Sequence, residues 1–118
     1  MLNKLERNIA SYANVRVNDF SIDIEKIERG VVFLYCAWST TIVQLRNLLI
    51  AMENYEGINL FIFDIDEAGA LRFLVKQGLR SDGWGETYWV RNGKVVSFLK
   101  KYGERNMEEL DNSNKMLL

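Results

Sequence analysis

The 118-residue chain is predicted to fold as an α/β domain, with a mixed β-sheet covered by helices on both faces. The segments Val31–Cys36 and Ile58–Ile65 are almost continuously apolar, as is typical of central strands buried on both faces. Each is followed by a segment with helical periodicity, and strands that alternate with helices pair in parallel. Asn92-Gly93 separates two further apolar runs and indicates an antiparallel hairpin, because both positions tolerate positive φ.

Three short elements are expected before the first buried strand. Residues 2–12 are predicted to form an N-terminal helical extension, because apolar residues recur there at helical spacing with charges between them. Residues 14–17 alternate like a short strand. Residues 19–28 place three apolar side chains on one helical face, which predicts a second helix.

The most regular helical pattern follows the first buried strand. Residues 40–54 have a continuous apolar face, and Ser39 suits the N-cap position. The pattern places Gln44 and Asn47 on the polar side of this helix. We therefore expect both amides to face solvent.

The second half of the chain continues the alternation. A helix is expected over residues 67–77, with Asp66 as its N-cap and Gly78 as its C-cap. Residues 87–90 and 95–98 are predicted to form the two hairpin strands. The order of elements is thus a helix, a βαβαβ series, and a closing hairpin.

The C-terminal segment is predicted to end in one more helix. Asn106 and Glu109 have the spacing of a capping box, in which each side chain bonds the backbone of the other residue. Residues 112–118 are expected to be a frayed tail, since chain ends are ordered only where something fixes them.

The composition narrows the classes of function. The 15 basic and 16 acidic side chains give a formal net charge of -1, without the excess of Lys and Arg that nucleic-acid binding needs. No apolar run approaches the roughly 18 residues of a membrane span, and the N-terminus lacks the apolar stretch of a signal peptide. We therefore expect one cytoplasmic domain over residues 1–118, with no nucleic-acid and no membrane partner.

Three absences limit the chemistry further. The chain has no His, so no imidazole can act as a base or a metal ligand. It has one Cys, which excludes an intrachain disulfide, and no Pro, which excludes a cis-prolyl turn. A zinc site would need carboxylates and a single thiolate, so we expect neither a metal nor another cofactor.

Several short motifs occur in an order shared with a known family. They are the strand that runs into Ala37-Trp38, the helix that starts at Ser39, the strand ending Asp64-Ile65-Asp66, the Gly78-Leu79-Arg80 segment, and the Asn92-Gly93 hairpin. In this order and spacing the chain resembles the thioredoxin family from Asn14 to Leu110. The resemblance implies a four- to five-stranded mixed sheet, with the N-terminal helix as an addition.

The departures from the family concern its redox site. Thioredoxins carry a Cys-x-x-Cys motif where this chain has Ser39 and Ile42, and Ile42 cannot resolve a mixed disulfide. The family's buried Asp corresponds to Phe33, and a nearby Lys to Ile62. Residues 81–85 replace the cis-Pro loop. The resemblance therefore implies the fold without thioredoxin activity, and we expect no catalytic residues.

Eight residues form the candidate partner-binding face, because the family binds extended polypeptide there: Trp38, Ser39, Thr40, Thr41, Asp82, Trp84, Gly85 and Glu86. The hydroxyl residues could equally be helix caps. Trp84, between two glycines, is either an interface anchor or a cover for the core. Asp82 and Glu86 are either solvated loop charges or an acidic rim for a basic partner.

The first hypothesis is a non-catalytic protein that binds another protein. Two versions fit, a bacterial immunity or inhibitor protein that neutralises a toxin, and an assembly chaperone with a client enzyme. The alternative is a divergent enzyme that uses Cys36 or Ser39, although Cys36 lies in an apolar strand and suits the core. A homodimer through an exposed sheet edge is a third hypothesis.

Overall fold

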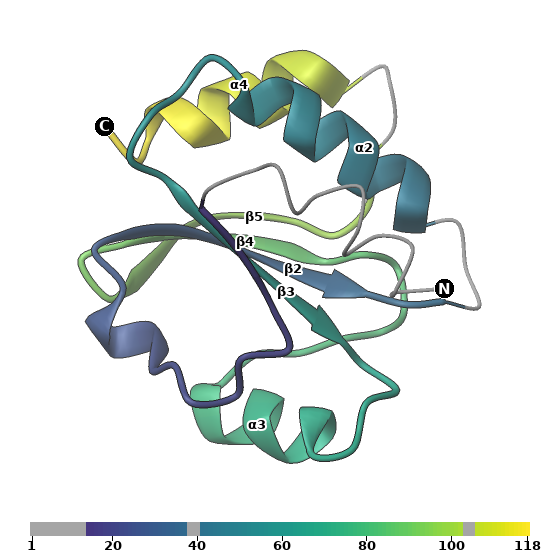
Figure 1. Cartoon of the computed structure of the whole chain (residues 1–118). Coiled ribbons are helices and arrows are strands. Elements are labelled where there is room, and N and C mark those ends of the chain that lie inside the picture. The colour runs from purple at the N-terminus through teal and green to yellow at the C-terminus, as the bar shows by residue number, and fades with distance from the viewer. Residues whose placement is uncertain (1–13, 38–40, 103–105) are drawn as a thin grey trace.

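A computed structural model of the chain describes residues 14–37, 41–102 and 106–118 (Figure 1). The predicted helix over residues 2–12 lies outside these ranges. The elements are β1 (Val15–Val17), the 3-10 helix η1 (Ile24–Lys26), β2 (Arg29–Tyr35), α2 (Thr41–Met52), β3 (Asn59–Asp64), α3 (Ala70–Gln77), β4 (Thr87–Arg91), β5 (Lys94–Leu99) and α4 (Met107–Lys115).

The described strands form one five-stranded mixed sheet in the order β1-β3-β2-β4-β5. β1 and β2 pair with β3 in parallel, and β4 pairs with β2 and β5 in antiparallel. Asn92 and Gly93 join β4 to β5 with φ angles of 50° and 79°. The predicted mixed sheet and its hairpin are therefore confirmed, with the two longest apolar runs at the centre.

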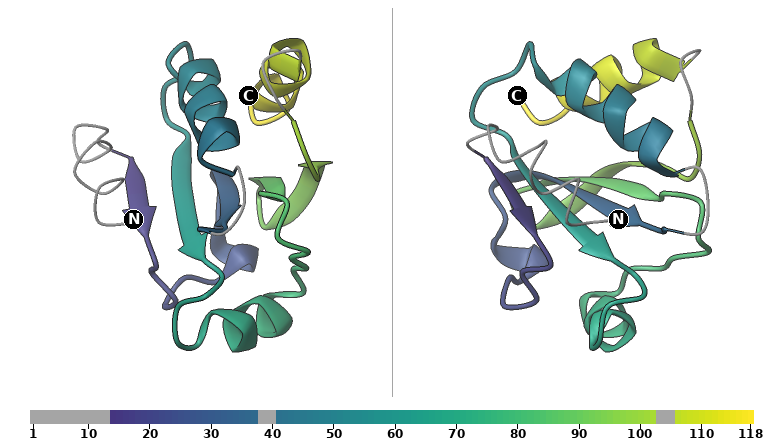
Figure 2. Two further views of the ribbon diagram at one scale, coloured as in Figure 1. Left: turned by 90° about the vertical axis from the view of Figure 1, so that its right-hand side faces the viewer. Right: turned by 45° about the vertical axis from the view of Figure 1, so that its right-hand side comes forward.

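Helices cover both faces of the sheet (Figure 2). α2 and α4 lie together on one face, and α3 lies on the other with η1 (Figure 1). Each interface holds its own cluster of buried side chains, one including Phe33, Leu48 and Trp89, the other including Leu34, Phe63 and Phe73. Burial on both faces accounts for the continuous apolar sequence of β2 and β3.

The helix predicted over residues 19–28 is wrong. Only Ile24–Lys26 form a single turn of 3-10 helix, and the rest of the segment is irregular. The Asp19 and Asp23 carboxylates each accept a hydrogen bond from the backbone N–H two residues further on. Such local bonds compete with helical ones, so the apolar side chains reach the core from a loop.

The N-cap predicted at Asp66 is also wrong. α3 starts three residues later than expected, at Ala70, and follows Gly69 with φ at 86° and no side-chain cap. The Asp66 N–H instead donates to the carboxylate of Asp64, at 3.0 Å, in a turn that precedes the helix. At the other end Gly78 takes φ of 71° and bonds the last helical carbonyls, as predicted.

Residues 112–118 are not frayed. Asn114 is fully buried, and its side chain accepts a hydrogen bond from Trp89 Nε1 at 2.9 Å and donates to the Ala51 carbonyl at 3.3 Å. Leu117 is also fully buried. A polar sequence thus forms an ordered end because one amide is satisfied by β4 and α2 together.

Side-chain contacts rather than a capping box hold α4 against α2. Asn106 makes no side-chain capping bond, so the box expected with Glu109 does not form. Tyr55, just beyond α2, donates its hydroxyl hydrogen to the Asp111 carboxylate, which raises the pKa of Tyr55 to about 12 and lowers that of Asp111. Lys115 pairs with the same carboxylate at 3.1 Å.

Leu117→Ala is predicted to destabilise the protein by about 2–5 kcal/mol, because it leaves a cavity in the core. The neighbouring Leu118 is 55% exposed, so Leu118→Ala is expected to change stability by no more than about 0.5 kcal/mol. Denaturant unfolding of both variants measures the difference. Equal stabilities would contradict the ordered tail.

Candidate functional site

The predicted site residues fall at the start of α2 and in the loop that precedes β4. Trp38, Ser39 and Thr40, with the cap predicted at Ser39, lie outside the described residues. Thr41 and Gly85 are brought together, since a Cβ atom built on Gly85 would lie 3.1 Å from the Thr41 methyl carbon. The structure therefore places Thr41, the first residue of α2, against the loop.

The side chain of Thr41 closes the turn between β2 and α2. Its hydroxyl donates to the Cys36 carbonyl at 2.8 Å and accepts from the Cys36 N–H at 3.1 Å. Both residues are buried. Thr41 is therefore a structural residue of the turn and is absent from the surface on which we expected a partner to touch it.

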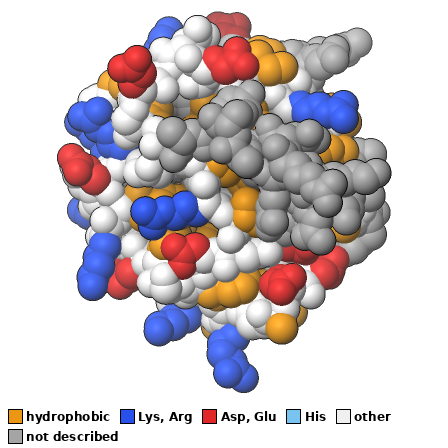
Figure 3. Space-filling model, in the orientation of Figure 1, with side chains coloured by type: hydrophobic (Ala, Val, Ile, Leu, Met, Phe, Trp, Pro, Cys, Tyr) orange, Lys and Arg blue, Asp and Glu red, His pale blue; other side chains and the backbone are white. Residues whose placement is uncertain are grey.

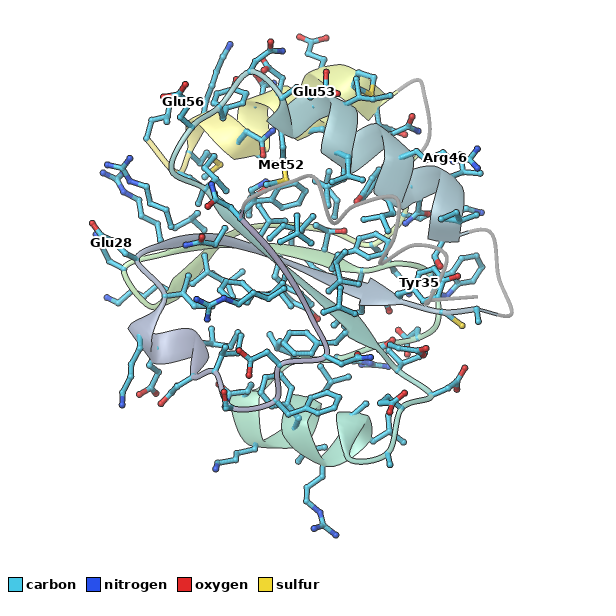
Figure 4. All side chains as sticks on the ribbon, viewed as in Figure 1. Glu28, Tyr35, Arg46, Met52, Glu53 and Glu56 are labelled. Carbon is cyan, nitrogen blue, oxygen red and sulfur yellow. The ribbon has the colours of Figure 1, made fainter. Side chains whose placement is uncertain are left out.

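Tyr35 ends β2 beside the start of α2 (Figure 4). Its hydroxyl is buried and has no hydrogen-bond partner within the described ranges. Burial, followed by the nearby charge of Asp64, raises the pKa of this phenol. Tyr35 is part of the core between the sheet and α2, so it too is inaccessible to a partner.

Glu86 lies inside the loop rather than on a rim. Only 1% of the residue is exposed, and its carboxylate accepts hydrogen bonds from the backbone N–H groups of Asp82 and of Trp84, the latter at 3.0 Å. Its own carbonyl accepts from the Leu34 N–H at 3.0 Å, which fixes this point of the loop to β2. The backbone donors replace water around a charge that would otherwise be costly to bury.

Gly85 and Gln44 join the loop to α2. The Gly85 carbonyl accepts from Gln44 Nε2 at 3.1 Å and from the Thr87 hydroxyl at 3.0 Å. Gly85 has φ of 82°, and a Cβ atom there would lie 2.3 Å from Gln44 Nε2, so only glycine fits. Gln44 and Asn47 are buried, which corrects their assignment to the exposed side of the helix.

Two tyrosines complete the attachment of the loop. The Tyr88 hydroxyl donates to the Arg80 carbonyl at 2.7 Å and accepts from the Arg80 N–H at 3.0 Å. The Tyr102 hydroxyl lies 2.8 Å from that of Thr87. Burial raises the pKa of both phenols, so both stay neutral at physiological pH. The loop is thus bonded at its start, middle and end.

Trp84 is the exposed centre of this loop, with 45% of its surface accessible. The Lys101 ammonium group lies 4.8 Å from the centroid of the Trp84 ring system. The Asp82 carboxylate lies 3.5 Å from Arg80 Nε and 3.4 Å from Lys100 Nζ. We call these five residues the Trp84 surface.

The charge of the Trp84 surface fits neither alternative drawn from the sequence in full. Asp82 and Glu86 were to be either solvated loop charges or an acidic rim, but Glu86 is buried and Asp82 is exposed and paired with two cations. Three cationic side chains against one exposed carboxylate make the surface basic. By contrast, both signs are interspersed over the face of the molecule seen in Figure 3.

The structure adds two general findings on possible chemistry. Within the described ranges, no group of three or more acidic or sulfur-bearing side chains is arranged to hold a metal ion. None of the helices there is long and apolar enough to cross a membrane. Cys36, the single Cys of the chain, is buried at the end of β2.

Glu86→Gln is predicted to destabilise the protein by about 1–3 kcal/mol, because one carboxylate oxygen becomes an NH₂ group that faces a backbone donor. The amides of residues 82 and 84 should also exchange hydrogen faster. The control is Asp82→Asn, whose exposed ion pairs are worth about 1 kcal/mol or less. Unchanged exchange at both amides in Glu86→Gln would contradict the role given to this carboxylate.

Comparison with known proteins identifies the fold. No protein-family model matches the chain, and no curated protein matches its sequence. Among solved structures, oxidized thioredoxin O2 from Arabidopsis thaliana is similar with a TM-score of 0.70 and 15% identity, over 89% of this chain and 95% of that one. Desulfothioredoxin from Desulfovibrio vulgaris Hildenborough has a TM-score of 0.63 and 13% identity, over 84% of this chain and 96% of that one. Oxidized thioredoxin O1 from Arabidopsis thaliana has a TM-score of 0.64 and 14% identity, over 84% of this chain and 96% of that one. Such identities establish the architecture alone. The chain therefore has a thioredoxin fold.

Proposed function

We propose that this chain is a non-catalytic thioredoxin-fold protein that binds another protein through the Trp84 surface. The observation that carries the proposal is a half-exposed Trp on a loop whose backbone is held from below by Glu86, Gln44 and Tyr88. Trp is enriched among the residues that dominate binding energy. A loop that is already ordered loses little conformational entropy when a partner docks.

The surroundings of Cys36 support a role without thiol chemistry. A reactive Cys needs access and a stabilised thiolate, whereas Cys36 is fully buried in a turn closed by Thr41. The chain offers no second Cys to resolve a mixed disulfide and no His to serve as a base. The alternative, an enzyme that uses Cys36 or Ser39, lacks a comparable supporting observation.

The proposal has two biological versions. In one, the protein is a bacterial immunity or inhibitor protein and the partner is a toxin. In the other, it is a cytoplasmic assembly chaperone and the partner is a client enzyme. Both need a preformed docking surface of the kind around Trp84. A toxin gene beside the gene for this chain would favour the first version, and a metalloenzyme operon the second.

Cys36 is predicted to react with a thiol reagent slowly in the native protein and rapidly, at one thiol per chain, in denaturant. The reason is burial, which keeps the reagent from the sulfur. An insulin-reduction assay should show no activity. Rapid labelling of the native thiol, together with an activity that Cys36→Ala abolishes, would overturn the binding proposal in favour of the enzyme.

Trp84→Ala is predicted to weaken partner binding by about 2 kcal/mol or more, roughly 30-fold in Kd, while the fold stays intact. The partner would be captured on tagged protein from the native host and its affinity measured by calorimetry. Val75→Ala is the matched control, because Val75 is 80% exposed on α3 and is not one of the five residues of the Trp84 surface. Equal affinities of Trp84→Ala and the unmodified protein would contradict the proposal that the partner binds the Trp84 surface.

A further inference from the structure

We infer that the Trp84 surface binds an acidic segment of the partner, in which an apolar side chain packs on Trp84 while flanking carboxylates pair with the surrounding cations. This inference rests on the proposed function and specifies the partner's chemistry. It is opposite to the alternative of an acidic rim for a basic partner, which required Asp82 and Glu86 both to face outward.

The local charge of the Trp84 surface favours an acidic partner. Arg80, Lys100 and Lys101 stand against Asp82 on a chain whose overall net charge is -1. The basic character is therefore local to this surface. Glu86 adds little outward field, since its carboxylate is turned inward onto backbone N–H groups. A partner with clustered carboxylates would be attracted to this surface, and like charges would repel a basic one.

Arg80 and Lys100 are available to an incoming carboxylate. The Arg80 side chain is 85% exposed and that of Lys100 is 55% exposed, and each meets Asp82 at about 3.5 Å in single contacts. Exposed pairs of this kind contribute about 1 kcal/mol or less. Exchanging the Asp82 carboxylate for a partner's carboxylate therefore costs little, so both cations can turn to an incoming acidic group.

The Trp84 surface also pairs a cation with an aromatic ring. Lys101 holds its ammonium group 4.8 Å from the centroid of the Trp84 ring, so a positive charge lies against a half-exposed aromatic side chain. A carboxylate that meets Lys101 brings the neighbouring residue of an extended partner segment onto the ring. The surface thus fits a segment that alternates acidic with aromatic or aliphatic residues.

The same features argue against a nucleic acid as the occupant. Single strands are bound by an extended basic groove with several stacking aromatic rings. Here the described surface has one exposed Trp and three cations, in a chain with an isoelectric point near 5.5. An acidic polypeptide is therefore the occupant that the chemistry favours.

The test uses defined probes on the full chain. Two synthetic peptides of equal length, one alternating Glu with Leu and Phe and the other with Lys in place of Glu, are titrated by calorimetry, and the Trp84 indole N–H is followed by NMR. An oligothymidylate is the third probe. We expect only the acidic peptide to bind and to shift the indole signal, with an affinity that falls about tenfold as salt screens the contacts.

Variants separate the inference from the proposed function. Lys101→Glu should lower affinity for the acidic peptide at least tenfold, whereas Lys76→Glu, the same charge change at an exposed position on α3, should leave it unchanged. Preferential binding of the Lys peptide or the oligothymidylate overturns the inference. So does a native partner whose binding needs Trp84 but tolerates Lys101→Glu, although the proposed function then stands. If a native partner binds Trp84→Ala and Lys101→Glu as tightly as it binds the unmodified protein, the inference and the proposed function are both wrong.

Discussion

The buried carboxylate of Glu86 fixes the geometry on which the candidate surface depends. An unsolvated carboxylate is costly unless donors surround it, so the preceding loop must wrap around it and direct two N–H groups inward. The carbonyl of the same residue bonds Leu34 in the central strand. One residue therefore links the register of the sheet, the path of the loop and the outward position of Trp84.

The loop around Glu86 stands where the resemblance to thioredoxins places a cis-Pro loop. The resemblance placed a cis-Pro loop there, whereas the described part of this chain contains no cis peptide bond. The loop turns through Gly83 and Gly85, both with positive φ, and hydrogen bonds from Gln44 and Thr87 lock its end. A network of side chains thus does the ordering that a proline ring does covalently. The loop held in this way carries Trp84 in a half-exposed position.

The parts of the fold that were predictable are those set by local or periodic patterns. The buried strands followed from their apolar runs, and the hairpin and the end of α3 from the positive φ that Asn92, Gly93 and Gly78 can adopt. The errors concern polar side chains, some of which bond the backbone two residues away, as Asp19 and Asp23 do, while others bond a distant partner. Gln44 lies inside because of a carbonyl 41 residues away, and Asn114 because of an indole on β4.

The burial of Glu86 could not be predicted from the sequence. Its position beside Asp82 and Trp84 suggested solvent-exposed charge, because acidic residues in glycine-rich loops normally face water. A single sequence does not distinguish a carboxylate that faces solvent from one that accepts hydrogen bonds from its own loop, because the preceding residues are the same in both cases. A weak signal was present in the spacing, which places two backbone donors within four residues before the carboxylate.

The enclosed position of Cys36 has a consequence for where such a protein could work. Disulfide exchange requires an attacking thiolate to reach sulfur, and here the sulfur belongs to a fully buried residue. Because the chain has a single Cys, it can form no intrachain disulfide for glutathione to reduce. An oxidant or a thiol reagent would reach the fully buried Cys36 only when the structure around it opens locally.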